Sequence, residues 1–375
     1  MNKELTSREA AALLGVSAAT LYAYVSRGLL TSIPDGAARS KRYAREEVLR
    51  LAARKADGKR AGHAVAAAMH WGVPVLESRI SLIADGKLFY RGRDSSELAA
   101  HATLEQTAAI LRDEPAAPTA ASSAVPTLPP AVAALGHAMP PLERAMAFLP
   151  VLAAKPATPA ELMRMLAALL LDTEMSSAPL HEQVARAWGV DGAGKELLRA
   201  ALVLLADHEL NTSAFTVRCV ASTGAALPAV LCAGLAALSG REHGGHYLMA
   251  KEVLEAQLGG ETELPLPPMQ PGFGHPLYPG GDPRAVLLLE MMRPLPQAAG
   301  VLALAARAAA IKGAEPNSDY ALAALELVLD LPAHSGIILF ALARSAGWLA
   351  HAAEQAADGA MIRPRARYVG HYSAG

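Results

Sequence analysis

Helical spacing of apolar residues over two long stretches is the feature that most limits what this chain can fold into. In residues 141–208 and 322–357, apolar side chains recur three and four positions apart, between Pro and Gly residues that interrupt the pattern. Apolar residues make up 52% of the chain but aromatic residues only 5%, which suits closely packed helices better than a sandwich of strands. A chain of 375 residues can bury a large core in two or three folding units. We therefore expect a mostly α-helical protein with more than one domain.

Residues 81–92 predict a short β-hairpin within this helical protein. An Asp85-Gly86 turn lies between two apolar segments, which is the strongest short-range hairpin signal in the chain. Residues 114–130, in contrast, are rich in Pro, Ala, Ser and Thr and show no period. We expect an exposed loop or a flexible insertion there.

The first 60 residues predict a small basic module. They hold 12 Lys and Arg residues against 6 Asp and Glu residues, although the whole chain has a net charge of −1. A capping-box sequence from Thr6 to Glu9 begins one helix, Gly15 ends it, and Ser17 can cap a second helix. A basic loop and an amphipathic helix over residues 45–53 follow, and the polar residues 54–60 have the composition of a linker.

This order of elements resembles the MerR-like and excisionase-like helix-turn-helix modules, over residues 5–55. Such a module places its second helix in the major groove of DNA, while arginines of the following loop neutralise phosphates. The side chains available for contacts with duplex DNA are Ser17, Thr20, Tyr22, Tyr24, Arg27, Arg39, Lys41 and Arg42. The alternative is a helical hairpin that docks onto its own protein.

Several classes of protein find no support in the sequence. Cys219 and Cys232 lie in apolar runs and do not form a metal-type pair, so we expect a reducing compartment without disulfides. The N-terminus has no apolar signal core, and the most apolar stretch, residues 221–238, is interrupted by polar, Gly and Pro residues. No phosphate-binding loop, dinucleotide fingerprint or nucleophile elbow is present. We expect a cytoplasmic protein that does not associate with membranes.

The remaining candidates for chemistry are isolated His, Asp and Arg residues in segments rich in Gly and Pro. Glycine allows close approach of the backbone to a ligand and proline fixes the chain, so these segments suit side chains that must be aimed. Any single histidine of this kind is more often a hydrogen-bonded structural residue. His243 and His246 bracket two glycines and have no cluster of Cys or carboxylates nearby, so we do not expect a metal site.

Seven segments, in their order along residues 81–370, resemble the citrate synthase family. They are residues 88–92, 207–213, 243–245, 272–284, 317–319, 344–355 and 363–370. The resemblance implies an all-helical homodimer. Its large domain comprises residues 61–245 and 329–375, and its small domain, residues 246–328, closes over the substrate. Residues 1–60 form the DNA-binding-like module in front of them.

The activity implied by the resemblance is a Claisen-type condensation of acetyl-CoA with oxaloacetate to citrate and CoA, with acetyl-CoA as a substrate and no further cofactor. Asp319 matches the base that removes a proton from acetyl-CoA. His243 matches the group that hydrogen-bonds the developing enolate oxygen. His275 matches the group that polarises the oxaloacetate carbonyl and protonates the alkoxide.

Oxaloacetate carries two carboxylates, which planar guanidinium groups bind in a bidentate manner. Arg284, Arg344 and Arg363 match the carboxylate-binding positions of the family. His208 matches a further oxaloacetate contact. Each arginine taken alone could instead form an ion pair on the surface or between domains.

Two segments depart from the family pattern. A small residue, Asn and Glu usually follow His-Gly-Gly, whereas His246, Tyr247 and Leu248 follow here. An aromatic residue, Tyr, Ser and Gly usually follow the catalytic aspartate, whereas residues 320–324 read Tyr-Ala-Leu-Ala-Ala. Both departures bear on turnover and on the choice of acyl-CoA.

Three functions remain open. The first is a citrate synthase, which the three matched catalytic groups favour. The second is a transcriptional regulator that uses a citrate synthase-like body as ligand sensor and dimeriser, which the basic module and the altered segments favour. The third is a 2-methylcitrate synthase, which would differ only in a pocket for propionyl-CoA.

Overall fold

The computed structural model describes residues 4–26, 29–34, 41–49, 51–52, 76–115, 130–153, 156–260, 271–366 and 368–371. The chain folds as two compact units, one within residues 1–77 and the other within residues 78–375. Most described residues are helical, so the prediction of a mostly α-helical protein is confirmed. The predicted linker over residues 54–60, Arg27, Arg39 and most of the predicted loop over residues 114–130 lie outside the described residues.

The N-terminal unit is a pair of helices with a small antiparallel sheet. Helices α1 (Ser7–Leu14) and α2 (Ala18–Ser26) precede the hairpin strands β2 (Ser32–Pro34) and β3 (Lys41–Ala44), and β1 (Glu4–Thr6) completes the sheet in the order β1-β3-β2. Residues 45–49 and 51–52 are helical, as predicted. The unit has its own core, which includes Leu5, Leu14, Leu21, Leu30, Tyr43 and Val48.

The local signals at the start of both helices are confirmed. The Thr6 amide donates to Glu9 Oε2 at 2.8 Å, and Thr6 Oγ1 accepts from the Glu9 amide at 3.3 Å, which is the predicted capping box. Gly15 ends α1 with φ of 59°, a conformation that favours glycine. Ser17 Oγ accepts from the Thr20 amide at 3.2 Å at the start of α2.

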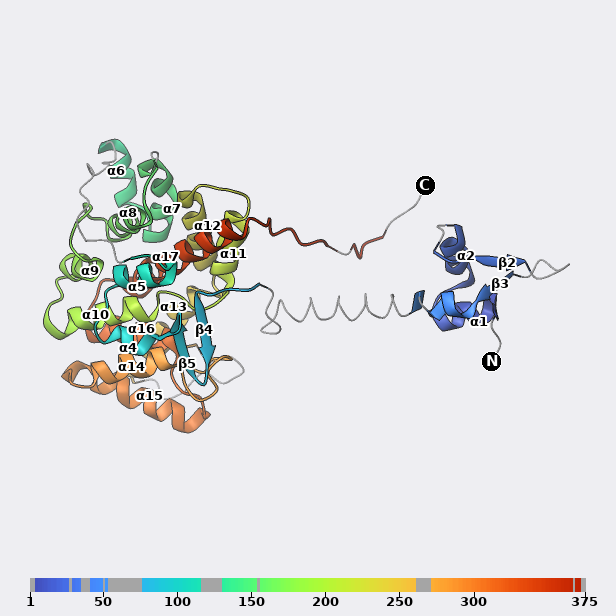
Figure 1. Cartoon of the computed structure of the whole chain (residues 1–375). Helices are drawn as coiled ribbons and strands as arrows, with labels where there is room; N and C mark the ends of the chain where they lie inside the picture. Colours follow the sequence, from blue (N-terminus) through green and yellow to red (C-terminus); the bar gives the residue numbers. More distant parts are fainter. Residues whose placement is uncertain are drawn as a thin grey trace. The chain divides into compact units, whose positions relative to one another are not determined.

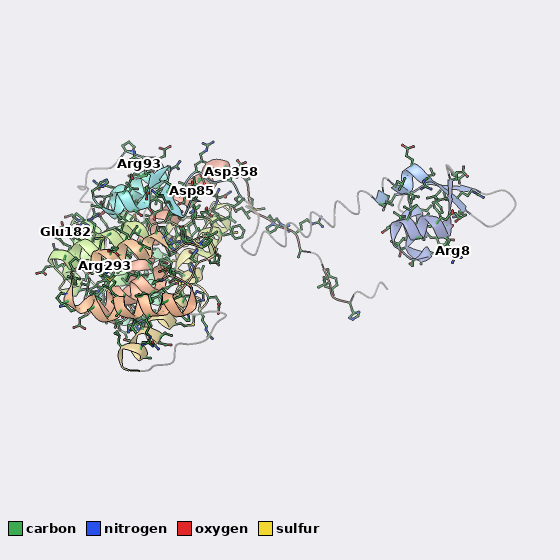
Figure 2. The ribbon with its side chains drawn as sticks, turned by 90° about the horizontal axis from the view of Figure 1, so that it is seen from below. Arg8, Asp85, Arg93, Glu182, Arg293 and Asp358 are labelled. Carbon is green, nitrogen blue, oxygen red and sulfur yellow. The ribbon has the colours of Figure 1, made fainter. Side chains whose placement is uncertain are left out.

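The second unit is a helical array with one small sheet (Figure 1). Its helices are α4 (Ser95–Ala99), α5 (Leu104–Arg112), α6 (Pro130–His137), α7 (Pro141–Leu152), α8 (Pro159–Leu171), α9 (Leu180–Trp188), α10 (Gly192–Leu204), α11 (Thr212–Ala221), α12 (Leu227–Leu238), α13 (Gly245–Leu258), α14 (Pro283–Met292), the 3-10 helix η1 (Pro296–Ala298), α15 (Ala299–Lys312), α16 (Ser318–Val328) and α17 (Ser335–Asp358). Within this unit, exposed charged residues such as Asp85, Arg93, Arg293 and Asp358 lie on the outside (Figure 2).

The sheet of the second unit contains the predicted hairpin. Strands β4 (Ser81–Ala84) and β5 (Lys87–Tyr90) pair in antiparallel register, and both turn residues, Asp85 and Gly86, have positive φ as a tight hairpin turn requires. The short third strand β6 (Arg93–Asp94) was not predicted. The buried Tyr90 hydroxyl lies 3.0 Å and 2.9 Å from the carbonyl oxygens of Val203 and Leu204, which anchors the sheet to the end of α10.

Helix α17 is the central element of the second unit. Its length and composition would allow it to cross a membrane, but 94% of its most apolar window is buried inside the protein, as in the core helix of a soluble protein. Gly347 of α17 lies directly against residues 206 and 207, where its amide donates to the Ala206 carbonyl at 3.0 Å. A side chain at this position would overlap the segment that leads to His208. The close approach therefore requires glycine.

Replacing this glycine should destabilise the second unit. We expect Gly347→Ala to lower the free energy of unfolding by about 2–3 kcal/mol, because the new methyl group would lie 2.6 Å from the Ala206 oxygen and also meet Asp207. Gly300→Ala in α15 is the matched control, since its methyl group would meet only the flexible end of Leu258. Urea unfolding would measure both variants. Equal stability of the two variants would contradict the packing argument.

Candidate active site

Three histidines and an aspartate from separate segments form one cluster in the second unit. His208 follows α10, His243 precedes α13, His275 lies in the loop before α14, and Asp319 lies in the first turn of α16. The ring centroids of His208 and His275 are 5.0 Å apart, and the Tyr278 ring lies 5.6 Å and 5.0 Å from them. The Tyr278 hydroxyl lies 3.0 Å from His208 Nε2.

Two loops are joined side by side and thereby bring His275 and Asp319 into the same region. The Asn317 amide donates to the Gly272 carbonyl at 2.9 Å, and the Gly274 amide donates to the Glu315 carbonyl at 2.8 Å. Asn317 also caps α16, because its Oδ1 accepts from the Asp319 amide at 3.0 Å. This pairing fixes both catalytic candidates relative to one another.

A buried ion pair holds Arg284 at the base of the cluster. Arg284 Nε and Nη2 donate to the two carboxylate oxygens of Asp282 at 2.9 Å and 2.7 Å. Asp282 Oδ2 also accepts from the Ser318 amide at 3.0 Å, so one carboxylate links the first turns of α14 and α16. Burial favours the neutral form of Asp282, but Arg284 more than offsets this effect and the pKa of Asp282 lies below its ordinary value.

Arg344 forms no comparable ion pair with any residue that the structure describes. It projects from the middle of α17 and is 1% exposed, and its Nε donates to the Leu205 carbonyl at 3.0 Å. Its Nη1 is buried without a hydrogen-bond partner among the described residues. Burial lowers the pKa of Arg344 to about 10, which still leaves the group charged at neutral pH. The site therefore contains a buried cation that is stabilised by the charge of Asp207 but whose Nη1 donor has no hydrogen-bond partner among the described residues.

The three histidines are neutral at neutral pH. Burial, together with the charge of Arg344, lowers the pKa of His243 to about 4. Burial and Arg284 lower the pKa of His275 to about 4. Burial and both arginines place the pKa of His208 well below its ordinary value. Neutral imidazoles can donate a hydrogen bond without adding positive charge to the site.

Hydrogen bonds orient the two catalytic imidazoles. The Leu277 amide donates to His275 Nδ1 at 3.2 Å, so the ring proton of neutral His275 lies on Nε2. Ser213 Oγ donates to Asn211 Oδ1 at 2.9 Å, and His243 Nε2 lies 2.9 Å from the same Ser213 Oγ. Ser213 has a single hydroxyl hydrogen for these two neighbours. While this hydrogen is donated to Asn211, His243 Nε2 donates to Ser213 and holds the ring proton; if the hydrogen turns to His243, the ring proton moves to Nδ1, where it can donate to a ligand.

Asp319 is the carboxylate of the cluster. Its side chain is half-buried, and burial raises its pKa to about 6, against the opposing effects of nearby cations. A carboxylate with such a pKa is ionised at neutral pH and is a stronger base than an exposed aspartate. The cluster thus combines a carboxylate of raised pKa, two imidazoles oriented by hydrogen bonds and two buried arginines.

Other residues of the matched segments support this cluster from outside. Asp207 accepts from Ser81 Oγ and lies 3.2 Å from His351 Nε2, and both Asp207 and His351 are fully buried. Arg218 of α11 donates to Glu354 at 2.6 Å and to Gln355 at 2.9 Å. These residues tie α11, the sheet and α17 together and do not belong to the cluster itself.

The predicted carboxylate ligand Arg363 is not part of this cluster. It lies exposed in the irregular segment after α17. The predicted DNA contacts lie in the separate N-terminal unit, where Ser17, Tyr22 and Lys41 are exposed and Thr20 and Arg42 are half-buried. In the part of the chain that the structure describes, no group of three His, Cys, Asp or Glu side chains could hold a metal ion.

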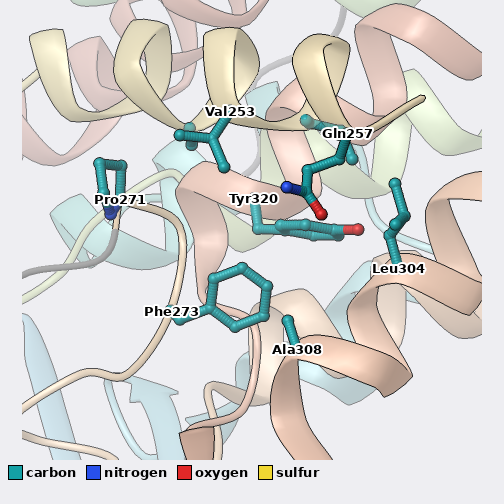
Figure 3. Close-up of a pocket in the computed structure, with 9 residues that line it drawn as sticks. Val253, Gln257, Pro271, Phe273, Leu304, Ala308 and Tyr320 are labelled. Carbon is teal, nitrogen blue, oxygen red and sulfur yellow. The ribbon is translucent and has the colours of Figure 1, made fainter. Parts of the chain in front are cut away.

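A small apolar pocket lies beside the cluster (Figure 3). Phe273 and Tyr320, neighbours of His275 and Asp319 in sequence, form part of its wall with ring centroids 5.0 Å apart. Helices α13 and α15 supply the remaining wall, which includes Val253, Gln257, Leu304 and Ala308. None of the predicted catalytic groups lines this pocket.

Three functional neighbours were not assigned from the sequence. Asp282 pairs with Arg284, Ser213 contacts His243, and Tyr278 contacts His208. All three lie inside the matched segments, and the first two also fit helix-start patterns: Asp282 caps α14 and Ser213 follows the cap of α11. Their partners are distant in sequence or set by side-chain direction, which a pattern of residues does not contain.

The two buried arginines should differ in their effect on stability. We expect Arg284→Met to lower the free energy of unfolding by about 3–5 kcal/mol, because Asp282 would remain buried without its partner. Arg344→Met should lower the free energy of unfolding by less, because Arg344 interacts with the charge of Asp207 but forms no ion pair with a described residue. Urea unfolding of the ligand-free protein measures both. A larger loss of stability in Arg344→Met would contradict this interpretation of the site.

Two family models match the chain. One, described as "Citrate synthase, C-terminal domain", matches residues 68–365, and another, described as "Helix-turn-helix domain", matches residues 4–56. Citrate synthase from Haloferax volcanii and citrate synthase 2 from Bacillus subtilis are each 36% identical over 191 residues, which cover 47% of this chain and 50% and 51% of those proteins. The chain thus spans about half the length of the curated relatives it matches.

Solved structures share the fold more completely. Citrate synthase from Thermotoga maritima aligns with a TM-score of 0.62 and 25% identity, over 81% of this chain and 96% of that chain. A ternary complex of carboxymethyl coenzyme A and oxaloacetate with citrate synthase from Thermoplasma acidophilum aligns with a TM-score of 0.64 and 23% identity, over the same shares of both chains. Because the first family model covers well over half of its residues, this chain belongs to the citrate synthase family, with a helix-turn-helix domain at its N-terminal end.

Proposed function

We propose that the protein condenses acetyl-CoA with oxaloacetate to form citrate and CoA. The observation that carries this proposal is the buried Arg344 guanidinium, whose Nη1 lacks a hydrogen-bond partner among the described residues. A buried cation with an unused donor is costly unless a ligand supplies the anion. Arg344 lies in the same cluster as neutral histidines and the carboxylate of Asp319. These are the groups that the proposed reaction needs.

Oxaloacetate is the proposed source of that anion. One of its carboxylates would accept from Arg344, and the second would lie toward Arg284, whose own charge is balanced by Asp282. His208, a neutral donor or acceptor held by Tyr278, would contact the same substrate. The Thermoplasma acidophilum relative was solved with oxaloacetate and a coenzyme A derivative bound, which supports this assignment.

Acetyl-CoA would be activated between Asp319 and His243. Asp319 accepts a proton from the methyl carbon of acetyl-CoA. Its raised pKa makes the carboxylate a stronger base toward this weak carbon acid. As the C–H electron pair moves into the enol, the thioester oxygen gains negative charge. His243 donates to that oxygen through Nδ1 when the Ser213 hydroxyl hydrogen is directed at Nε2.

Bond formation would then use His275. The enol carbon attacks the keto carbon of oxaloacetate, and the carbonyl oxygen becomes an alkoxide. His275 holds its proton on Nε2 and can donate it to that oxygen. Water attacks the resulting citryl thioester, the C–S bond breaks, and citrate and CoA leave.

The proposal also covers the choice of acyl donor and the oligomeric state of the protein. One relative, 33% identical over 191 residues, is named citrate/2-methylcitrate synthase, so propionyl-CoA is the alternative acyl donor. A homodimer is the expected assembly. In that assembly the exposed Arg363 would be available to bind a carboxylate in the partner subunit's site. We place the enzyme in the cytoplasm.

Replacing the base should abolish turnover without removing substrate binding. We expect Asp319→Asn to lower oxaloacetate-dependent release of CoA thiol from acetyl-CoA by roughly 10²- to 10⁴-fold. Calorimetric binding of oxaloacetate should be retained, because both buried arginines remain in place. Asp330→Asn, an exposed position just after α16, is the control and should keep full activity. Undiminished turnover in Asp319→Asn would remove this residue from the mechanism.

The N-terminal unit supports a second function, binding of duplex DNA. The first 60 residues carry six more basic than acidic residues, and the unit has a separate core that keeps its helices and hairpin in place. Lys41 Nζ lies 5.8 Å from the centroid of the Tyr22 ring, so the hairpin and the exposed face of α2 meet on one side. With the body as ligand sensor, the protein would act as a transcriptional regulator.

Removing the hairpin charges tests this function. We expect Lys41→Ala combined with Arg42→Ala to weaken binding to duplex DNA and to reduce the slope of log affinity against log salt by about 0.9 for each phosphate that is no longer neutralised. Arg93→Ala combined with Arg186→Ala removes the same charge from exposed positions of the second unit and serves as control. Equal DNA binding by both double variants would exclude the hairpin as the DNA-binding element. If the unaltered protein does not bind DNA at low salt, the alternative that the N-terminal helices dock onto the protein itself is favoured.

A further inference from the structure

Tyr247 is one of the residues at which this chain departs from the citrate synthase pattern, which usually has Asn at this position. It lies in the first turn of α13, its side chain is fully buried, and the proposed reaction does not use it. Its hydroxyl donates to the carboxylate of Glu326, which lies in the last turn of α16 and is 3% exposed. Burial and the neighbouring Glu326 raise the pKa of Tyr247, so the hydroxyl keeps its proton at neutral pH and acts as the donor.

The same buried pair also binds the first turn of α17. The start of a helix leaves its first amides without partners in that helix. The Gly336 amide, which is one of these, donates to Glu326 Oε2 at 3.1 Å and lies 3.4 Å from the Tyr247 hydroxyl. A side chain at position 336 would overlap the Tyr247 ring, so the ring occupies the space that glycine leaves. The pair thereby joins the start of α13, the end of α16 and the start of α17.

His243 is held against the same end of α17. Its ring lies edge to face with the ring of Phe340, with centroids 5.7 Å apart. The next residue, Gly244, packs so closely on Ile337 that a side chain there would overlap it. The Arg344 guanidinium lies over the same Phe340 ring, 4.9 Å from its centroid. The imidazole proposed to stabilise the enolate therefore rests on the helix that carries a substrate-binding arginine, and it does so four residues before the buried pair.

Asp319 is linked to the same pair along α16. Glu326 follows it by seven residues, which places both side chains on one face of the helix, two turns apart. Glu326 also meets the next turn of α13, where Lys251 Nζ lies 3.5 Å from Glu326 Oε1. Two successive turns of α13 thus hold the end of α16. The position of Asp319 relative to His243 depends on this joint, because one residue is carried by α16 and the other by the segment that begins α13.

We propose that Tyr247 and Glu326 are positioning residues: their hydrogen bond, shared with the Gly336 amide, holds His243 and Asp319 in place relative to one another. This inference rests on the proposed function, in which those two residues activate acetyl-CoA. The pair acts through the helices that it joins and not through contact with the reacting atoms. The two buried arginines are held by other contacts, so binding of oxaloacetate should not depend on this pair.

Tyr247→Phe tests this role, because it keeps the ring that fills the space at Gly336 and removes only the hydroxyl. We expect kcat for condensation to fall by roughly 10-fold, since a small displacement of the reacting groups is costly, while the calorimetric Kd of oxaloacetate stays the same. Glu326→Gln keeps an oxygen that can accept from both donors and should retain kcat within about twofold. Thr107→Val is the matched control, because it removes a buried hydroxyl whose bond to the Thr103 carbonyl is local to α5. It should lose comparable stability without loss of kcat.

A spectroscopic measurement on the ligand-free protein decides the role of the pair without substrate. The His243 ring lies edge to face with Phe340, so the NMR shifts of its ring protons report any movement of one ring against the other. We expect these shifts to change in Tyr247→Phe and to stay the same in Glu326→Gln and Thr107→Val, with His243→Gln used to assign the signals. Unchanged His243 shifts in Tyr247→Phe, or an undiminished kcat in a protein that catalyses condensation, would overturn the proposal. If the shifts change but no condensation is observed, the proposed reaction fails and the positioning role of the pair stands.

Discussion

The carboxylate of Asp282 is the interaction on which the site depends. It neutralises Arg284, caps α14 and receives the amide of Ser318 at the start of α16. One buried charge thereby fixes two helices and the loop segments that precede them. The second buried arginine, Arg344, interacts with the charge of Asp207 but forms no such ion pair with a described residue, and its Nη1 has no hydrogen-bond partner there. Burial, reinforced by the nearby charge of Arg284, keeps the imidazoles of His208 and His275 neutral.

Much of the fold could be predicted because its signals are local. The capping box at Thr6, the Asp85-Gly86 hairpin and the helical period of the long apolar stretches depend on neighbours within a few residues. The third strand, β6, could not be predicted, since two residues carry no period. The large and small domains of the second unit remain a prediction from family resemblance.

The residues of the site could be named from motifs, but their relations could not. Six of the seven predicted catalytic and substrate-binding residues lie close enough to affect each other's charge: His208, His243, His275, Asp319, Arg284 and Arg344. Arg363 does not join them within its own chain. The motifs do not show that Asp282 neutralises Arg284 or that Ser213 contacts His243. These relations depend on side-chain directions and on contacts between separate segments. The sequence does not show what the altered residues after His243 contact. In the structure, the Tyr247 hydroxyl donates to the Glu326 carboxylate.

The separate core of the N-terminal unit has a consequence for how the protein can change. The core residues of this unit and those of the helical body form two distinct sets. A substitution that loosens one set need not alter the cooperative melting of the other. Substitutions can accumulate in the N-terminal unit without destabilising the helical body, and the body can change without unfolding the N-terminal unit. A substitution in one unit can therefore be selected with little effect on the stability of the other unit.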